Sequence, residues 1–449
     1  MRPQVTLPVS APVGGHELTP GQEALWFLQR LAPDSSAYNV SGAVNLHFPV
    51  DVDILGAAVQ RAVSRHSMLN CLFQLTGQEV RRRSGIAVRQ APLLTVREVT
   101  GDDHEVAAAA KKIAQRPFRL DRDPPIRVVL LRRENDPDIL LVAAHHIVAD
   151  NVSQVLIFRE IFAEHAALMT GTTHTPPDTG EGFDAFVLRQ KNFLTSARAD
   201  AARAHWRDEL TDLPAGGLPT DLPRPRIYPY TGSEFDFMIP PDVLADAEKA
   251  AAAGRTSLFV YLHSVFQLLM HRHSGNDEFL IGFPATMRSN RRFREAIGYF
   301  VNLLPYRVRI GRGTTFDAVL RTTAEKTWRG LLHREFPYAL MPRLVDARPD
   351  PGRAGLVETM FVMTDGEPGD PLAALVLPGR QASFAGVTLS EFYLPQQQGQ
   401  SDLTLQVLRH GAAARSHMKY NTSLFTEDTA RGLAGEYLDL LRAAIRGDI

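Results

Sequence analysis

Two adjacent histidines and an aspartate four residues beyond them are the side chains in this sequence best suited to chemistry. His145, His146 and Asp150 stand where an apolar run gives way to a helix-like segment. Side chains at the end of a strand can point into a crevice instead of into the core. An imidazole with a pKa of about 6.5 can accept a proton at neutral pH. The motif therefore predicts a histidine that acts as a general base.

The same residues also have a purely structural interpretation. His145 could be a hydrogen-bonded histidine of the core, and Asp150 could be a helix N-cap, a position that aspartate favours. Six residues alone do not decide between these interpretations. A zinc site is not expected, because the sequence has no His-Glu-x-x-His motif and no Cys/His cluster beside the pair.

The motif is expected at a turn between a buried strand and a helix. Residues 126–131 and 138–144 are apolar runs of strand length, with Pro, Asn and Asp between them. This pattern is typical of adjacent buried strands. Beyond Asp150, apolar residues continue with a spacing that indicates a helix.

Strands and helices alternate along the whole chain. We predict helices after Thr19 and over residues 51–68, 256–272, 315–332 and 427–445, and strands over residues 278–283, 303–310, 402–408 and 416–421. Residues 171–182 show no periodicity and are the best candidate for a linker. The sequence thus predicts an α/β protein of the α+β type, with lobes at residues 1–175 and 176–449, each a mixed sheet covered by helices.

The composition is that of an ordinary globular protein. The 449 residues are 44% hydrophobic and carry a net charge of −1, which disfavours a nucleic-acid binder. The only cysteine, Cys71, excludes an intrachain disulfide, and we expect it to be a buried small residue. The sequence has no secretory signal pattern and no apolar stretch near the ~20 residues of a membrane span, so a cytoplasmic protein is expected.

Further motifs follow one another in a fixed order. They lie at residues 18–28, 65–73, 145–150, 183–186, 281–288, 297–305, 333–338 and 401–403. Each is weak, but the ordered series resembles the condensation domains of nonribosomal peptide synthetases, within the superfamily that includes chloramphenicol acetyltransferase. The resemblance covers residues 18–446.

The resemblance implies two acetyltransferase-like lobes in a V-shape with a tunnel between them. His146 would face the tunnel and take a proton from the acceptor, or hold the acceptor and stabilise developing charge. The donor acyl group would arrive on the phosphopantetheine arm of a peptidyl or acyl carrier protein. The acceptor would be an amine or hydroxyl, on a small molecule or on a second carrier protein. The arm is then a substrate, and no bound cofactor is expected.

The resemblance also implies roles for other residues. Asp150 would pair with Arg288 from the other lobe and fix the loop that carries His146. Asn302, Asn151, Ser153 and Gly298 would lie along the substrate tunnel, although Asn302 could instead form a hydrogen bond at a strand end. Two positions depart from the family pattern. Asn151 replaces the usual glycine after Asp150, and Asn70 replaces a usual arginine, so the usual substrate is in doubt.

Because no adenylation or carrier domain is attached, we expect a free-standing enzyme of natural-product biosynthesis that forms an amide or an ester. Three alternatives remain open. They are an epimerising relative, a coenzyme A-dependent acyltransferase, and a module that only recruits other enzymes. The basic runs at residues 81–83 and 288–294 could bind an acidic carrier protein or could simply be solvated.

Overall fold

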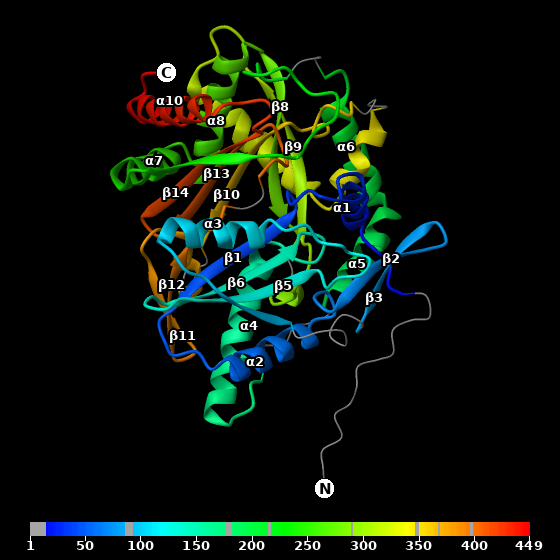
Figure 1. The fold of residues 1–449 in the computed structure, drawn as a ribbon. Helices are drawn as coiled ribbons and strands as arrows, with labels where there is room; N and C mark the ends of the chain where they lie inside the picture. Colours follow the sequence, from blue (N-terminus) through cyan, green and yellow to red (C-terminus); the bar gives the residue numbers. More distant parts are fainter. Residues whose placement is uncertain are drawn as a thin grey trace.

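A computed structural model describes residues 15–85, 93–175, 182–213, 217–288, 291–345, 350–366, 369–395 and 398–449. Half of the predicted linker at residues 171–182 lies outside these ranges, because residues 176–181 are not described. Two sheets and the helices on them form two lobes, which lie one above the other in Figure 1.

The first lobe is built on a mixed sheet of six strands in the order β11-β12-β1-β6-β5-β4. The strands are β1 (Asn39–Leu46), β4 (Leu94–Glu98), β5 (Ile126–Arg132), β6 (Asp138–His145), β11 (Gln381–Phe384) and β12 (Val387–Phe392). The helices of this lobe are α2 (Val52–Arg65), α3 (Asp103–Ala114) and α4 (Asn151–Thr170). A separate hairpin joins β2 (Cys71–Thr76) to β3 (Glu79–Ser84).

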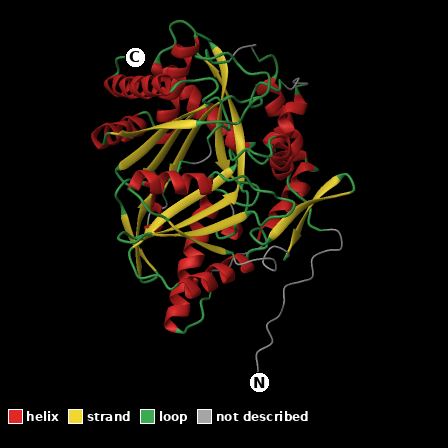
Figure 2. Cartoon of the chain, in the orientation of Figure 1, coloured by secondary structure: helices red, strands yellow, loops and turns green. Residues whose placement is uncertain are grey.

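The second lobe has a mixed sheet in the order β7-β14-β13-β10-β8-β9. Its strands are β7 (Ser233–Ile239), β8 (Glu278–Thr286), β9 (Val301–Arg309), β10 (Thr359–Asp365), β13 (Leu403–His410) and β14 (Ala413–Tyr420). Helices α7 (Pro241–Ala253), α8 (Leu258–Ser274), α9 (Phe316–Leu332) and α10 (Glu427–Arg446) pack with this sheet. Helices α1 (Pro20–Leu31), α5 (Gly182–Leu194) and α6 (Ala197–Leu210) lie along one side of the molecule (Figure 2).

The two sheets do not divide cleanly at the predicted boundary between residues 175 and 176. β11 and β12 belong to the second half of the sequence but pair onto β1 of the first sheet. Phe183, Phe293 and Phe300, also from the second half, pack in the core of the first lobe. The lobes are therefore interlocked, and each contains chain from both sides of the predicted boundary.

The hydrophobic pattern explains why β6 lies in the centre of the first sheet. β6 is buried from Ile139 to His145, and its neighbours β1 and β5 cover both of its edges. A strand buried on both faces has a continuous apolar run, as this one does. Helix α2 instead buries the single stripe Leu55, Ala58, Val59, Ala62 and Val63, which confirms the amphipathic helix predicted there.

Burial also accounts for the lone cysteine. Cys71 is fully buried and unpaired, and burial raises the pKa of its thiol to about 12. The thiol is therefore neutral at physiological pH, and the expectation of an inert core residue is confirmed. Among the helices that the structure describes, none combines the length and apolar character needed to cross a membrane.

Candidate active site

His146 lies in the turn between β6 and α4 and is held by two backbone contacts. Its amide nitrogen donates to the carbonyl of Tyr38 over 2.7 Å, and its Nδ1 lies 2.7 Å from the carbonyl oxygen of Ala149. A carbonyl oxygen can only accept a hydrogen bond, so Nδ1 carries the proton. In the neutral ring, Nε2 then has a free lone pair, as a general base requires.

The surroundings of His146 favour its neutral form. Burial lowers the pKa of His146 below 6.5, and the carbonyl of Ala149 and the charge of Asp150 oppose this only in part. The ring of Tyr299 meets the imidazole edge-on, with centroids 5.0 Å apart and planes at 80°. The side chain of His146 remains partly exposed. A partly accessible, unprotonated imidazole is thus present at neutral pH.

His145 has a different environment, although it is the next residue. Its ring is fully buried, with Nε2 3.1 Å from Oε1 of Gln29. Nδ1 accepts a hydrogen bond from the amide of Ile147, and burial lowers the pKa of His145 to about 3. Because both ring nitrogens are occupied within the core, the predicted catalytic role of His145 is wrong. His145 is a hydrogen-bonded histidine of the core, which is the structural interpretation that the motif alone could not exclude.

Asp150 is the N-cap of α4 and lies within a dense set of donors. Its carboxylate accepts hydrogen bonds from the amide and hydroxyl of Ser153, the amide of Phe300 and the guanidinium of Arg288. The Arg288 Nη2 to Asp150 Oδ1 distance is 2.9 Å, and both side chains are buried. The predicted pair with Arg288 is therefore present. We call these four residues the Asp150 cluster.

The charge balance of the Asp150 cluster argues against a role for Asp150 in proton transfer. Burial alone would raise the pKa of Asp150, but the charge and hydrogen bonds of Arg288 outweigh it and lower the pKa below its ordinary value. His146 directs its Nδ1 to Ala149 instead of to this carboxylate. Asp150 therefore stays ionised and positions the turn, and its predicted place among the catalytic residues becomes a positioning role.

Ser153 is a member of this cluster and Gly298 is hydrogen-bonded to it, so neither residue belongs to a tunnel wall. The Ser153 hydroxyl is fully buried and accepts from the amide of Gly298 over 3.1 Å. A side chain at Gly298 would meet Phe183, because a Cβ atom there would lie 2.1 Å from Cδ2 of that ring. The expectation that these two residues line the tunnel is corrected: they join α4 to the segment before β9.

Asn302 forms structural hydrogen bonds near the start of β9, which is the alternative to a place in the tunnel wall. Its two amide hydrogens go to the carbonyls of Arg334 and Phe336, and its Oδ1 accepts from the amide of Tyr338. The side chain thus fixes the segment after α9 and is not available to orient a substrate. Asn151, at the start of α4, is partly exposed, and its place beside the tunnel stays a prediction.

Several residues that support the His146 turn were not predicted to belong to the site. Gln22, in the first motif, donates from Nε2 to the carbonyl of Ile147 over 2.9 Å. Gln29 holds His145, and Tyr38 and Tyr299 contact His146 from outside the motif. Tyr299 lies inside the quoted motif at residues 297–305, so that motif carried the only signal for it.

A cavity of about 460 Å³ lies between the lobes. The first lobe contributes residues between Ala32 and Ser41, and the second contributes Tyr230, Thr231 and Gln398. Ser36 and Asn39 of the wall flank Tyr38, whose carbonyl holds the amide of His146. Residues 145–150 are not among the described residues that line this cavity, so a tunnel from it to His146 stays a prediction.

The comparisons with known proteins agree with this geometry. The family described as the condensation domain matches residues 14–447. The chain belongs to the condensation-domain family. Tyrocidine synthase 2 of Brevibacillus parabrevis is 25% identical over 442 residues, which are 98% of this chain and 12% of that protein. Phosphinothricin tripeptide synthetase PhsC of Streptomyces viridochromogenes is 31% identical over 436 residues, 95% of this chain and 39% of that protein.

A solved structure supports the same fold. The X-domain from teicoplanin biosynthesis superposes with a TM-score of 0.85 at 21% identity, over 98% of this chain and 96% of that one. The predicted family and the acetyltransferase-like fold of two mixed sheets are thus confirmed. Condensation domains are in general acyl-transfer enzymes that form C–N bonds. This condensation domain spans under half the length of either relative, 12% and 39%.

Removing the carboxylate of Asp150 is expected to unfold the protein. Asp150→Ala leaves Arg288 buried without its partner, and breaking such a pair typically costs ~3–5 kcal/mol. Denaturant melts should show this loss, and activity should fall in parallel with the folded fraction. Asp102→Ala is the matched control, because exposed Asp102 also caps a helix and should cost only ~0.5–2 kcal/mol. A variant that melts like the wild type but is inactive would contradict the positioning role.

The close contact at Gly298 gives a second test. Gly298→Ala pushes a methyl group into Phe183, and overpacking of this kind costs ~1–3 kcal/mol. The melting temperature should fall. Gly435→Ala on the exposed face of α10 meets no atom within 4 Å among the described residues and should be neutral or slightly stabilising. Equal melting temperatures for the two variants would refute the packing argument.

Proposed function

We propose that this condensation domain transfers an acyl or aminoacyl group from the phosphopantetheine thioester of a carrier protein to an amine or hydroxyl acceptor. The observation that carries the proposal is the bond from Nδ1 of His146 to the carbonyl of Ala149, which leaves Nε2 as a base. The general C–N bond-forming activity of the family supports an amine acceptor and an amide product. A hydroxyl acceptor, which would give an ester, is the alternative.

The chemistry needs one proton acceptor and no bound cofactor. The acceptor N–H or O–H donates to Nε2 of His146 as its nitrogen or oxygen attacks the thioester carbonyl. The carbon–sulfur bond then breaks, and the thiolate takes the proton back from the imidazolium. The new amide or ester and the free thiol balance the reaction. Ala149 keeps the ring oriented throughout by accepting from Nδ1.

The interlobe cavity is suited to part of this substrate. Hydroxyl and amide side chains line it, namely Ser35, Ser36, Asn39, Ser41, Thr231 and Gln398. A phosphopantetheine arm contains amide groups that such side chains can bind. A thioester of coenzyme A carries the same arm, so the cavity alone does not choose between a carrier protein and coenzyme A. Turnover of one donor loaded on a carrier protein and on coenzyme A separates the two sources.

Removal of the imidazole is expected to remove turnover and leave the fold. His146→Ala should lower kcat by ~10²–10⁴, the usual contribution of general acid–base catalysis. Product formation should be followed by mass spectrometry with acyl and aminoacyl carrier proteins and with both amine and alcohol acceptors. His104→Ala, on the exposed face of α3, is the control and should retain the wild-type rate. Wild-type turnover by His146→Ala would show that another group is the base, whereas absence of turnover by the wild-type protein would indicate a recruitment module.

The pH dependence should report the same residue. Because burial lowers the pKa of His146, the ring is unprotonated at pH 7 and loses its function only as the pH falls through a value below 6.5. With an alcohol acceptor, kcat/KM should be flat at neutral pH and decline on the acidic side of 6.5. An amine acceptor adds a second decline near its own pKa of about 8. An alcohol profile that declines above pH 7 would contradict the assignment of the base.

A further inference from the structure

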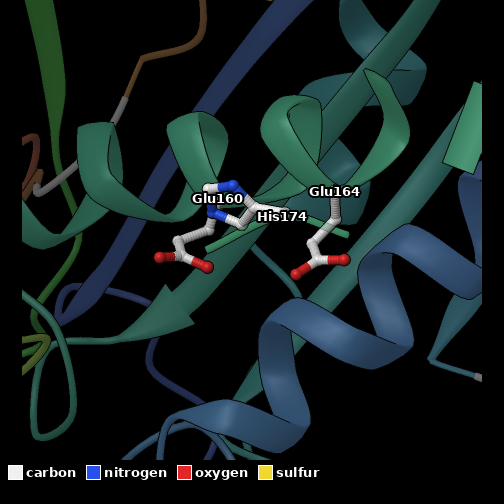
Figure 3. Close-up of side chains that lie close together, drawn as sticks. All are labelled: Glu160, Glu164 and His174. Atoms are coloured by element: carbon white, nitrogen blue, oxygen red, sulfur yellow. The ribbon is translucent and has the colours of Figure 1, made fainter. Parts of the chain in front are cut away.

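A cluster of histidine and glutamate side chains lies in the first lobe, on the part of α4 away from its N-terminus. Glu160 and Glu164 are one helical turn apart on α4, and His174 follows the helix C-cap at Gly171. Figure 3 shows the two carboxylates on the same side of α4, with the His174 ring beside them. One donor atom from each residue lies within 4.8 Å of the donor atoms of the other two.

A second histidine faces the same place from α2. His66, the C-cap of α2, is 8% exposed, and its Nε2 has no hydrogen-bond partner among the described residues. This nitrogen lies 4.0 Å from Oε1 of Glu160. The Nε2 atom of His174 is likewise buried without a partner in the described part of the chain. A small cavity of about 80 Å³ is lined by His66, Glu160 and His174 together.

Unpartnered buried nitrogens cost free energy, because they have lost their hydrogen bonds to water without gaining others. A ligand that accepts their lone pairs removes that cost. Burial lowers the pKa of His66 to about 4, so its ring is neutral at pH 7 and can offer a lone pair. Two imidazoles and a carboxylate around one small cavity form a donor set typical of zinc and related transition metals.

The neighbouring arginines limit which carboxylate oxygens are free. Arg65 is paired with Oε2 of Glu160 and Oε1 of Glu164. Arg61 lies 3.6 Å from the other oxygen of Glu164. Oε1 of Glu160 is therefore the oxygen directed toward His66. Because Arg65 neutralises part of the carboxylate charge, the cluster is poorly suited to Ca²⁺ or Mg²⁺, which need several oxygen ligands.

We propose that His66, His174 and Glu160, with Glu164 beside them, form a binding site for a divalent transition-metal ion of the zinc class. Ligand bonds to zinc are about 2.0–2.2 Å long, so the donor atoms must approach one another by roughly 1 Å. His174 can supply this movement, because it lies in a segment outside the helices and is only partly buried. No sequence pattern indicated this site, because its ligands come from three separate segments.

The ion would link three elements of the first lobe and would not touch the reacting atoms. It would tie the end of α2 to the middle of α4 and to the segment after α4. Glu160 lies ten residues after Asp150 along α4, which is about 15 Å by helical rise. The site therefore stabilises the helix that carries the His146 turn, and its occupancy is independent of the proposed acyl transfer.

The test is metal binding by the full chain after removal of any affinity tag and treatment with chelator. Zn²⁺ should bind with one-to-one stoichiometry in competition with a chromophoric chelator and should raise the melting temperature. Co²⁺ should give the visible absorption of a four-coordinate site. His174→Ala should weaken Zn²⁺ binding more than tenfold and abolish the shift in melting temperature. His66→Gln should do the same if it folds.

His104→Ala provides the matched control, because His104 is an exposed histidine elsewhere in the same lobe. It should bind Zn²⁺ like the wild type. Wild-type protein that shows no stoichiometric binding and no stabilisation would overturn the proposal. Equal binding by wild type and His174→Ala would also overturn it, since the ion would then be held elsewhere. Neither result bears on acyl transfer, which the His146 variant tests separately.

Discussion

The ion pair between Asp150 and Arg288 is the interaction on which the rest of the site depends. It joins the start of α4 in the first lobe to the segment that follows β8 of the second sheet. Both charges are buried, so each is tolerated only because the other is present and because Ser153 and Phe300 complete the hydrogen bonding. The pair thereby fixes the end of the turn in which His146 lies, without contacting the base itself.

Two adjacent histidines differ in role because the strand ends between them. His145 is the last residue of β6, paired opposite Asn39 of β1, and its side chain enters the core beside Gln29. His146 begins the turn, where the backbone leaves the sheet and bonds to Tyr38 instead. One residue thus separates an imidazole with a pKa of about 3 from a partly exposed base. The side chain of His145 points into the core, and the side chain of His146, the next residue, is partly exposed.

The sequence predicted those features that local patterns encode. The structure contains the buried stripe of α2, the buried run of β6 and the helix after Asp150. The pairing of β12 with β1 could not be predicted, because it joins segments over 300 residues apart and leaves no periodic signal. The sequence alone placed Asn302 and Ser153 in the tunnel wall because their hydrogen-bond partners, too, lie far away along the chain. A polar residue in a motif shows that it is needed, but its hydrogen-bond partners are visible only in three dimensions.

The electrostatic arrangement explains why a carboxylate so near to His146 does not change its role. A free aspartate beside the ring would stabilise imidazolium and keep the base protonated at neutral pH. Arg288 pairs with the carboxylate of Asp150, and burial disfavours the protonated ring of His146 more than Asp150 favours it, so the resting imidazole is neutral. When the ring does accept a proton, the carbonyl of Ala149 and the residual field of Asp150 stabilise the cation. The ionised carboxylate, paired with Arg288, therefore positions the turn while the ring is neutral and favours the cation once the proton has been transferred.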